Sequence, residues 1–193
     1  AATAAQLIRR RHCTFTMAST PFLADLSREV AVSGPVPSLQ TFLCAGAPIP
    51  GPLVEQAQAA LGAQIISAWG MSENGAVTTT LPSDDAQRAV DTDGLPVPGA
   101  EVKVVDDLGQ ELPRGEIGQL WVRASSNFGG YLKRPHLNAT TDDGWFDTGD
   151  QARMDAQGYI RITGRSKDVI IRGGENIPVV EVESLLYRHP ADG

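Results

Sequence analysis

Side chains that could hold a phosphate and a metal ion follow one apolar run of the sequence. The run Gln64-Ile-Ile-Ser-Ala68 is typical of a buried strand, and Trp69-Gly-Met-Ser-Glu73 comes directly after it. The Ser72 hydroxyl could donate to a phosphate oxygen, and the Glu73 carboxylate is the oxygen ligand that Mg²⁺ prefers where it bridges protein and phosphate. Trp69 adds an aromatic face. A plain turn after a strand is the alternative interpretation.

Small residues follow a second apolar run, Leu39 to Cys44. In the segment Ala45-Gly-Ala-Pro48, the small side chains at Gly46 and Ala47 would let a flat ring lie against the backbone. Ligands of open α/β layers bind beyond the carboxyl ends of the strands, where both segments are placed. We therefore interpret both as candidate binding segments, although either alone would be an ordinary turn.

A third candidate is Asp150, in the segment Asp147-Thr-Gly-Asp150 that follows Gly144-Trp-Phe146. A carboxylate held on a tight turn can accept hydrogen bonds from both hydroxyls of a ribose. The alternative is an Asx-type turn between strands. Other glycine-rich segments match neither the dinucleotide-binding nor the P-loop spacing, and no Ser, His and Asp set has the context of a nucleophile elbow.

Composition excludes several classes of protein. The 193 residues carry a formal net charge of -7, whereas a general nucleic-acid binder needs clustered cations. No apolar run reaches the ~18 residues of a membrane span. Cys13 and Cys44 lack Cys-x-x-Cys spacing, and the three histidines complete no zinc signature. We predict a cytoplasmic protein with reduced thiols that binds neither nucleic acid nor zinc and does not span a membrane.

The first half of the chain alternates between helical and extended patterns, which predicts parallel strands with crossover helices. The expected α/β layer covers residues 1–94. Its expected helices lie at 2–11, 20–32 and 52–61, and its expected strands lie at 13–17, 39–44 and 64–68.

After Pro82 the pattern changes. Residues 83–93 are acidic and polar, which indicates a surface loop. Residues 95–164 are expected to form a mostly antiparallel β subdomain, a small distorted barrel, because turn signals separate short alternating runs. The expected strands lie at 101–105, 118–123, 151–154 and 159–163.

A basic, glycine-punctuated stretch from Gly164 to Glu183 marks another change of structural unit. A short β-branched run leads to Gly173-Gly174, whose backbone can adopt angles closed to other residues, and Pro178 is suited to the first turn of a helix. We expect residues 165–193 to form a third unit. A linker between domains is the simplest interpretation of this stretch by itself.

Taken in order, these segments resemble the adenylate-forming acyl-CoA synthetases, a superfamily that includes firefly luciferase and the adenylation domains of nonribosomal peptide synthetases. Within it, Thr14 to Phe22 and Ser126 to Pro135 are similar to cyclohexanecarboxylate-CoA ligase and medium-chain acyl-CoA ligases. The matching segments are Gly46-Ala-Pro48, Trp69-Gly-Met-Ser-Glu73, Gly115-Glu-Ile-Gly-Gln-Leu, Gly130-Tyr131 with Pro135, Trp145-Phe-Asp-Thr-Gly-Asp150, Gly164-Arg-Ser-Lys-Asp168, Gly174-Glu-Asn-Ile-Pro178 and Glu181-Val-Glu183.

The resemblance implies a two-step reaction in which a carboxylic acid and ATP give acyl-AMP and pyrophosphate, and CoA then displaces AMP. The implied fold class is α/β with an antiparallel β subdomain, the C-terminal half of a large AMP-binding domain followed by the start of its small lid domain. The implied nucleotide contacts are Gly46, Ala47 and Pro48 at the adenine, Trp69 at the aromatic position of the adenine and acyl pocket with Gly70 and Met71 beside it, Asp150 on the ribose diol and Arg165 on ribose or phosphate. The resemblance also implies Ser72 on phosphate, Glu73 on Mg²⁺, Lys167 at the hinge and Gly174 at the pantetheine tunnel.

The sequence departs from the family pattern in two conservative positions, because Trp69 stands where Tyr is usual and Ser72 where Thr is usual. The phosphate loop and the lid lysine of the family are expected outside these residues, so we expect the chain to be part of a longer protein and inactive alone. Two alternatives stay open: acyl transfer to a carrier protein instead of CoA, and a nucleotide-binding remnant without turnover.

Overall fold

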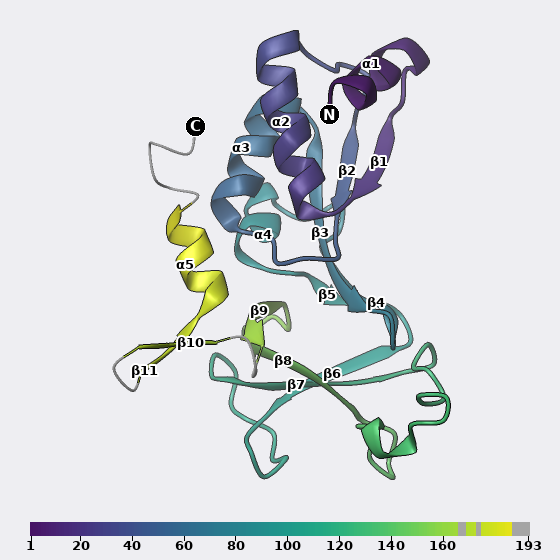
Figure 1. The fold of residues 1–193 in the computed structure, drawn as a ribbon, viewed down its shortest axis with the longest axis vertical. Coiled ribbons are helices and arrows are strands. Elements are labelled where there is room, and N and C mark those ends of the chain that lie inside the picture. Colours follow the sequence, from purple (N-terminus) through teal and green to yellow (C-terminus); the bar gives the residue numbers. More distant parts are fainter. Residues whose placement is uncertain (166–168, 173–174, 187–193) are drawn as a thin grey trace.

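The structure is a computed structural model of the chain, and it describes residues 1–165, 169–172 and 175–186 (Figure 1). A mixed five-stranded sheet occupies the N-terminal part, with strand order β1-β2-β3-β4-β5. The first three strands are parallel and the last two are antiparallel to their neighbours. The strands are β1 (Phe15–Ala18), β2 (Thr41–Cys44), β3 (Gln64–Met71), β4 (Gly75–Thr79) and β5 (Leu95–Pro96).

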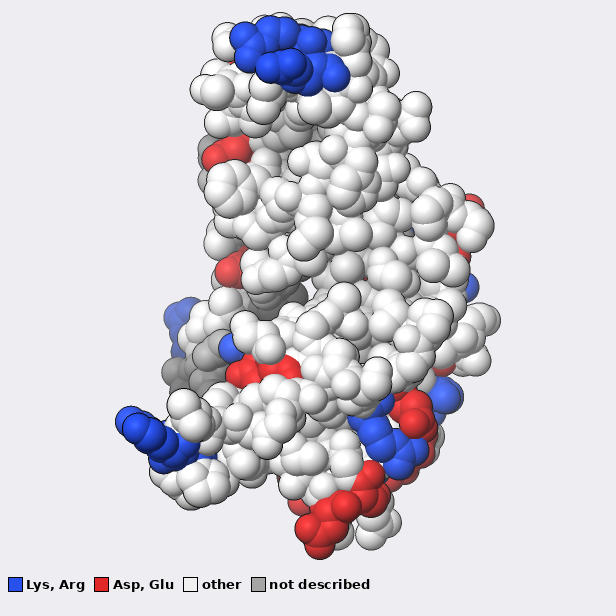
Figure 2. All heavy atoms as spheres, turned by 90° about the vertical axis from the view of Figure 1, so that its right-hand side faces the viewer, with Lys and Arg blue, Asp and Glu red and all other residues white. Residues whose placement is uncertain are grey.

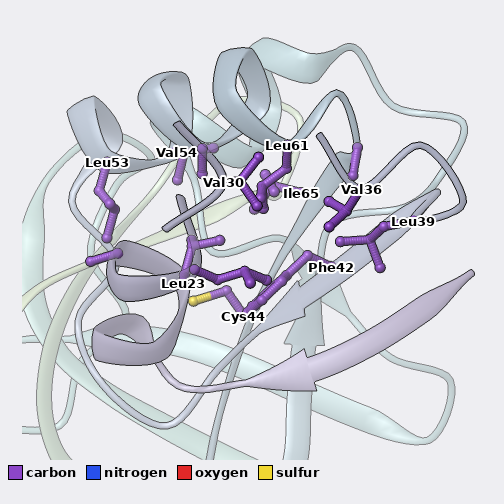
Figure 3. Packing of buried hydrophobic residues seen from close by; sticks show 14 of the residues in the cluster. Leu23, Val30, Val36, Leu39, Phe42, Cys44, Leu53, Val54, Leu61 and Ile65 are labelled. Carbon is purple, nitrogen blue, oxygen red and sulfur yellow. The ribbon is translucent and has the colours of Figure 1, made fainter. Parts of the chain in front are cut away.

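Four helices pack against this sheet: α1 (Ala2–Arg11), α2 (Thr20–Ser33), α3 (Gly51–Leu61) and α4 (Ala86–Asp91). The residues at the helix ends are typical of such positions. Ser19, which precedes α2, has an extended backbone, and a proline lies in the first turn of the helix. Helix α3 ends at Gly62, whose φ of 62° is left-handed. Between helices and strands lies the main hydrophobic core, which includes Leu23, Phe42, Leu53 and Ile65 (Figure 3).

A second sheet follows, an antiparallel four-stranded meander with order β6-β7-β8-β9. Its small core includes Leu120, Met154 and Ile160, and Trp69 of the first sheet packs against that core. In the described part of the chain the sheet is open, which differs from the predicted barrel. The strands are β6 (Ala100–Val105), β7 (Ile117–Ala124), β8 (Phe146–Met154) and β9 (Ile160–Arg165), and a short 3₁₀ helix, η1 (Pro135–Leu137), interrupts the loop between β7 and β8.

The C-terminal part is an antiparallel hairpin of β10 (Val169–Arg172) and β11 (Glu175–Pro178), followed by α5 (Val179–Leu186). Helix α5 begins directly after Pro178, as the sequence predicts. Strand β11 and helix α5 both lie against β9 (Figure 1). None of the helices in the described residues is long and apolar enough to cross a membrane.

The structure corrects three local predictions. Strand β3 continues through Trp69, Gly70 and Met71, because these residues pair with β4, and the expected loop is reduced to a turn at 72–74. The polar segment 83–93 contains α4, whose start is capped where the Asp85 side chain accepts from the Gln87 backbone N–H at 2.8 Å. Strand β8 begins at Phe146, so Asp150 lies within a strand and not on a tight turn.

The expected change of architecture along the chain is observed. Strands β1, β2 and β3 pair in parallel, whereas β6 to β9 pair antiparallel. The two sheets are separated between β5, which pairs with β4, and β6, which pairs with β7. The domain boundaries 1–94, 95–164 and 165–193 stay a prediction.

Candidate active site

A pocket of about 650 Å³ lies where the two sheets and α5 meet. Four segments predicted from the sequence are brought together in its walls: the loop Gly46–Pro48, the end of β3, Asp150 of β8 and Arg165 of β9. The pocket is lined by Gly46, Ala47, Pro48, Ile49, Ala68, Trp69, Gly70, Asp93, Asp150, Arg161, Ile162, Gly164, Arg165, Val179 and Glu183.

The Asp150 carboxylate joins the two sheets at this pocket. Asp150 is only 4% exposed. Its Oδ2 accepts a hydrogen bond from Trp69 Nε1 at 2.9 Å, and its Oδ1 accepts one from Arg165 Nε at 2.7 Å. A carboxylate oxygen has two lone pairs, so each oxygen can accept a further hydrogen bond from a ligand hydroxyl. The carboxylate is therefore held in one orientation and keeps acceptor capacity toward the pocket.

Irregular backbone in β8 explains how a strand presents this side chain. Gly149 has a φ of 72°, and the pairing of β8 with β7 is irregular here, because Gln151 pairs with Gln119 and Asp147 with Trp121, which leaves Thr148, Gly149 and Asp150 opposite Leu120 alone. The Asp150 backbone N–H donates to Thr148 Oγ1 at 3.1 Å, and the Thr148 hydroxyl donates to the Leu120 carbonyl at 2.7 Å. A bulge of this kind re-aims a side chain, which is common beside active sites.

The loop that contains Gly46, Ala47 and Pro48 forms the opposite wall. Gly46 has a φ of 90°, which a residue with a side chain rarely adopts. The buried Thr20 hydroxyl, at the start of α2, lies 2.9 Å from the Pro48 carbonyl and donates to it. The hydrogen bond from Thr20 therefore holds the loop in place, and the loop lines the pocket with small side chains, which a site for a flat ring requires.

Two further pocket residues were not predicted from the sequence. Asp93 is 5% exposed, and its Oδ2 accepts from the Ile162 backbone N–H at 2.8 Å. Its Oδ1 lies 3.8 Å from Nη1 of Arg161, whose Nη2 donates to the Ile49 carbonyl at 3.0 Å. Burial raises the pKa of the Asp93 carboxyl above its usual range, and the positive charge of Arg161 opposes that shift.

Ser72, Glu73 and Met71 are not among the residues that line the pocket. Ser72 is exposed in the turn between β3 and β4, and Glu73 is half-buried beside it. The Tyr131 hydroxyl donates to Glu73 Oε1 at 2.7 Å, and the Phe128 backbone N–H donates to the Glu73 carbonyl at 2.7 Å. The hydrogen bond to Glu73 also raises the pKa of Tyr131. The loop after β7 therefore crosses this turn.

Lys167 and Gly174, predicted at the hinge and at the pantetheine tunnel, lie outside the described residues. Within the described ranges, no group of three or more acidic, histidine or cysteine side chains could hold a metal ion by itself. Mg²⁺ commonly takes only one or two protein carboxylates and completes its shell with water and phosphate oxygens. Glu73 alone is compatible with that kind of site.

Two arginines, Arg161 and Arg165, are among the described residues that line the pocket. On the face shown in Figure 2, a basic cluster lies at the end where α1 is placed, and acidic and basic groups mix at the opposite end. The last turn of α1 carries Arg9, Arg10 and Arg11. The cation that the structure brings to Asp150 is Arg165, so the pocket combines an acceptor for hydroxyls with an adjacent positive charge.

A family model described as AMP-binding enzyme matches residues 1–132. The chain belongs to the AMP-binding enzyme family. Among curated relatives, the medium-chain fatty-acid–CoA ligase of Escherichia coli is 38% identical over 187 residues, which are 95% of this chain and 33% of that protein. Enterobactin synthase component E of the same organism is 41% identical over 80% of this chain and 29% of that protein. The chain therefore spans about a third of the length of these relatives.

Solved structures of adenylate-forming enzymes have the same fold. The O-succinylbenzoate CoA synthetase of Bacillus subtilis in complex with ATP and magnesium ion is 31% identical, with a TM-score of 0.82 over 98% of this chain and 39% of that chain. The anthranilate CoA ligase AuaEII in complex with anthranoyl-AMP is 32% identical, with a TM-score of 0.81 over 99% of this chain and 38% of that chain. The predicted superfamily and fold class are confirmed.

Proposed function

We propose that the protein is an AMP-forming acyl-CoA ligase that uses this pocket to bind the nucleotide of ATP and acyl-AMP. The observation that carries the proposal is the Asp150 carboxylate, buried and oriented by Trp69 and Arg165, facing a loop of small residues across one pocket. A ribonucleoside combines a flat ring with two adjacent hydroxyls, which are the groups that this arrangement suits. Membership of the AMP-binding family supports the same ligand.

In the proposed complex, the adenine ring lies between Gly46–Pro48 and Trp69, and the ribose hydroxyls donate to Asp150. Arg165, already paired with Asp150, supplies positive charge near the ribose or the α-phosphate. Closure of the lid over the pocket would exclude water and so protect a hydrolysable acyl-AMP. Each of these contacts is made by a side chain or backbone that the structure has already fixed, so little ordering is needed on binding.

The phosphates would then point toward the turn after β3, where Ser72 can donate a hydrogen bond. Mg²⁺ held by Glu73 would reduce the repulsion between the phosphates and an incoming carboxylate. An oxygen of the acid attacks the α-phosphorus as the bond to pyrophosphate breaks. In the second step the sulfur of CoA attacks the acyl carbon, and AMP leaves. Lys167 is proposed as the hinge between the steps, with Gly174 beside the pantetheine.

For the acid, we propose a medium-chain or alicyclic carboxylic acid, in a cytoplasmic setting. The similarity to the medium-chain fatty-acid–CoA ligase of Escherichia coli supports this class. A second candidate function is acyl transfer to a carrier protein. It is favoured by the similarity to Enterobactin synthase component E and to the Pyochelin synthase PchD of Pseudomonas aeruginosa, which is 38% identical over 95% of this chain.

Acid-dependent exchange of labelled pyrophosphate into ATP tests the first step. The complete protein should show exchange with at least one member of a panel of medium-chain, alicyclic and aromatic acids, and none without acid. Chromatography of the second-step product then separates the two acceptors: acyl-CoA should form without any carrier protein. No exchange with any acid would overturn the ligase proposal, and acylation of a carrier alone would favour the second candidate. The 193 residues by themselves are expected to bind nucleotide without turnover.

A further inference from the structure

Arg161 and Asp93 form an ion pair within the wall of the pocket. Their side chains are 16% and 7% exposed, and Arg161 Nη1 lies 3.8 Å from Asp93 Oδ1. Arg161 belongs to β9 of the second sheet, whereas Asp93 follows α4 and precedes β5 of the first. The pair thus crosses between the two sheets at the pocket that both sheets line.

Each partner also holds a piece of backbone on the other side of this junction. Arg161 Nη2 donates to the Ile49 carbonyl at 3.0 Å, which fixes the end of the loop that contains Gly46, Ala47 and Pro48. Asp93 Oδ2 accepts from the Ile162 backbone N–H at 2.8 Å, which fixes β9 just before Gly164 and Arg165. Arg161 therefore ties the wall predicted to contact adenine directly to the strand that carries Arg165. The segment of Asp93 is held to the same strand by its carboxylate and by backbone hydrogen bonds of Asp93 and Gly94 with Ile160.

Stability alone does not explain a pair in this position. Removing two charges from water is costly, and buried ion pairs can often be replaced by apolar residues without loss of stability. In the described part of the chain, Arg161 Nη1 is buried and makes no hydrogen bond, so the geometry is not optimised for the pair itself. The two residues do, however, hold two backbone segments that line the pocket, the one at Ile49 and the one at Ile162, at a fixed distance from each other.

We propose that Arg161, with Asp93 as its counter-ion, is a positioning residue for nucleotide binding that sets the spacing between the Gly46–Ile49 loop and β9. This inference rests on the proposed function of the pocket. In the proposed complex Arg161 and Asp93 do not contact the nucleotide, so their contribution to its affinity is indirect. The proposed complex gives Arg161 no part in binding the acid or the thiol, so we expect their binding to change little.

A second ion pair in the same chain provides a matched control. Arg88 of α4 lies 2.9 Å from Asp155, in the turn between β8 and β9, so this pair also connects the first sheet's helices with the second sheet. Both of its side chains are 33% exposed, and neither residue lines the pocket. Loss of the Arg88–Asp155 pair therefore removes an ion pair between the same two parts of the molecule, and we expect the pocket walls to stay in place.

The test compares Arg161→Met with Arg88→Met in the complete protein, by calorimetric titration with AMP and by kinetics of acid-dependent pyrophosphate exchange. For Arg161→Met we expect AMP affinity and the KM for ATP to become about tenfold poorer, the effect of losing one hydrogen bond from a charged group. The KM for the acid and the kcat at saturating ATP should stay within about twofold, well inside the factor expected for one such bond. Arg88→Met should match the wild type in all four values.

Loss of Arg161 alone leaves Asp93 buried without its counter-ion, and this single variant could fail to fold. The double variant Arg161→Met, Asp93→Asn has no buried charge and keeps an acceptor for the Ile162 N–H, so it is measured in parallel. If either folded variant binds AMP as tightly as the wild type, or if kcat falls while AMP affinity is unchanged, the positioning role is wrong. If the wild type itself binds no AMP, the proposed function fails instead.

Discussion

The wall of the pocket that comes from the first sheet consists mainly of backbone and small residues, whereas the wall from the second sheet carries charged groups. Gly46, Ala47, Pro48 and Gly70 belong to the first wall, and Ile49, Trp69 and the buried Asp93 are its larger side chains. Asp150, Arg161 and Arg165 belong to the second. The first wall therefore provides shape, and the second provides the hydrogen-bonding groups that orient a ligand.

The difference follows from how each sheet is stabilised. Parallel strands covered by helices have a large apolar core, so the first sheet can hold a rigid loop at the end of its strands. The second sheet has a smaller core and depends more on pairing between strands, which tolerates the irregular pairing of β8 with β7 at Asp150. A substitution in the first wall should act through steric fit, and one in the second through charge and hydrogen bonding.

The largest effect is expected for Gly70→Ala, which changes only the shape of the first wall. A Cβ at Gly70 would lie 2.0 Å from the Gly75 carbonyl oxygen, so β3 and β4 must separate where they now pair. We expect the free energy of unfolding to fall by about 3 kcal/mol or more, as for severe overpacking, together with loss of AMP binding. Chemical denaturation and calorimetry measure the two effects.

Gly129→Ala is the control for that substitution, because a Cβ at Gly129 would have no neighbour within 4 Å and its backbone is not left-handed. Its stability and AMP affinity should equal those of the wild type. A stable Gly70→Ala variant with normal AMP affinity would show that the first wall is not defined by close approach of the backbone.

A smaller effect is expected for Trp69→Phe, which keeps the aromatic face and removes one hydrogen bond to the charged wall. Asp150 loses the Trp69 Nε1 donor, so its carboxylate is held by Arg165 at one oxygen only. We expect AMP to bind about tenfold more weakly, or ~1.4 kcal/mol, the contribution of one hydrogen bond to a charged group. Calorimetric titration with AMP measures this change.

Trp121→Phe controls for the loss of an indole, because Trp121 Nε1 has no hydrogen-bond partner in the described residues and Trp121 does not line the pocket. It should leave AMP affinity unchanged. Equal AMP affinity in Trp69→Phe and wild type would mean that Arg165 alone orients Asp150.

The smallest effect is expected outside the pocket, at Glu101 and Arg123 on the second sheet. Arg123 Nη2 lies 2.8 Å from Glu101 Oε2, and the side chains are 43% and 61% exposed. The hydrogen bond from Arg123 lowers the pKa of Glu101, so the stabilisation is present above the unfolded-state pKa and is lost as the pH falls through the lowered folded-state value. Exposed pairs contribute little because water and salt screen them.

Thermal unfolding as a function of pH checks this expectation with Glu101→Gln. The variant should be slightly less stable than the wild type at neutral pH, and the difference should disappear in acid and shrink in high salt. A difference that persists in acid would have to come from packing and not from the ion pair.

The sequence was sufficient to predict α1 to α3, β1 to β3 and β6 to β9, but not α4, β4 or β5. It also predicted the segments that meet at the pocket, because small residues, aromatic residues and carboxylates follow the apolar runs. It misplaced Trp69 and Asp150 on loops. Both lie in strands, since pairing with β4 and with β7 and β9 extends β3 and β8 beyond their apolar runs. Such pairing is a tertiary effect that the local pattern does not contain.

Asp93 could not be predicted as a buried residue. It ends an acidic, polar segment typical of a surface loop, and its partners Arg161 and Ile162 lie far along the chain. Only the approach of β9 to the first sheet turns this carboxylate into part of a pocket wall. Residues whose role depends on contacts between two sheets have no signal of their own in the local sequence.

Calorimetric titration of AMP into the wild type, Asp150→Ala and Asp155→Ala tests the nucleotide assignment of the pocket most directly. Asp150 faces the pocket, whereas Asp155 pairs with Arg88 outside it. We predict that Asp150→Ala weakens AMP binding by about a hundredfold, the effect of losing two hydrogen bonds to a carboxylate, and that Asp155→Ala binds like the wild type. Wild-type affinity in a folded Asp150→Ala variant would contradict the account.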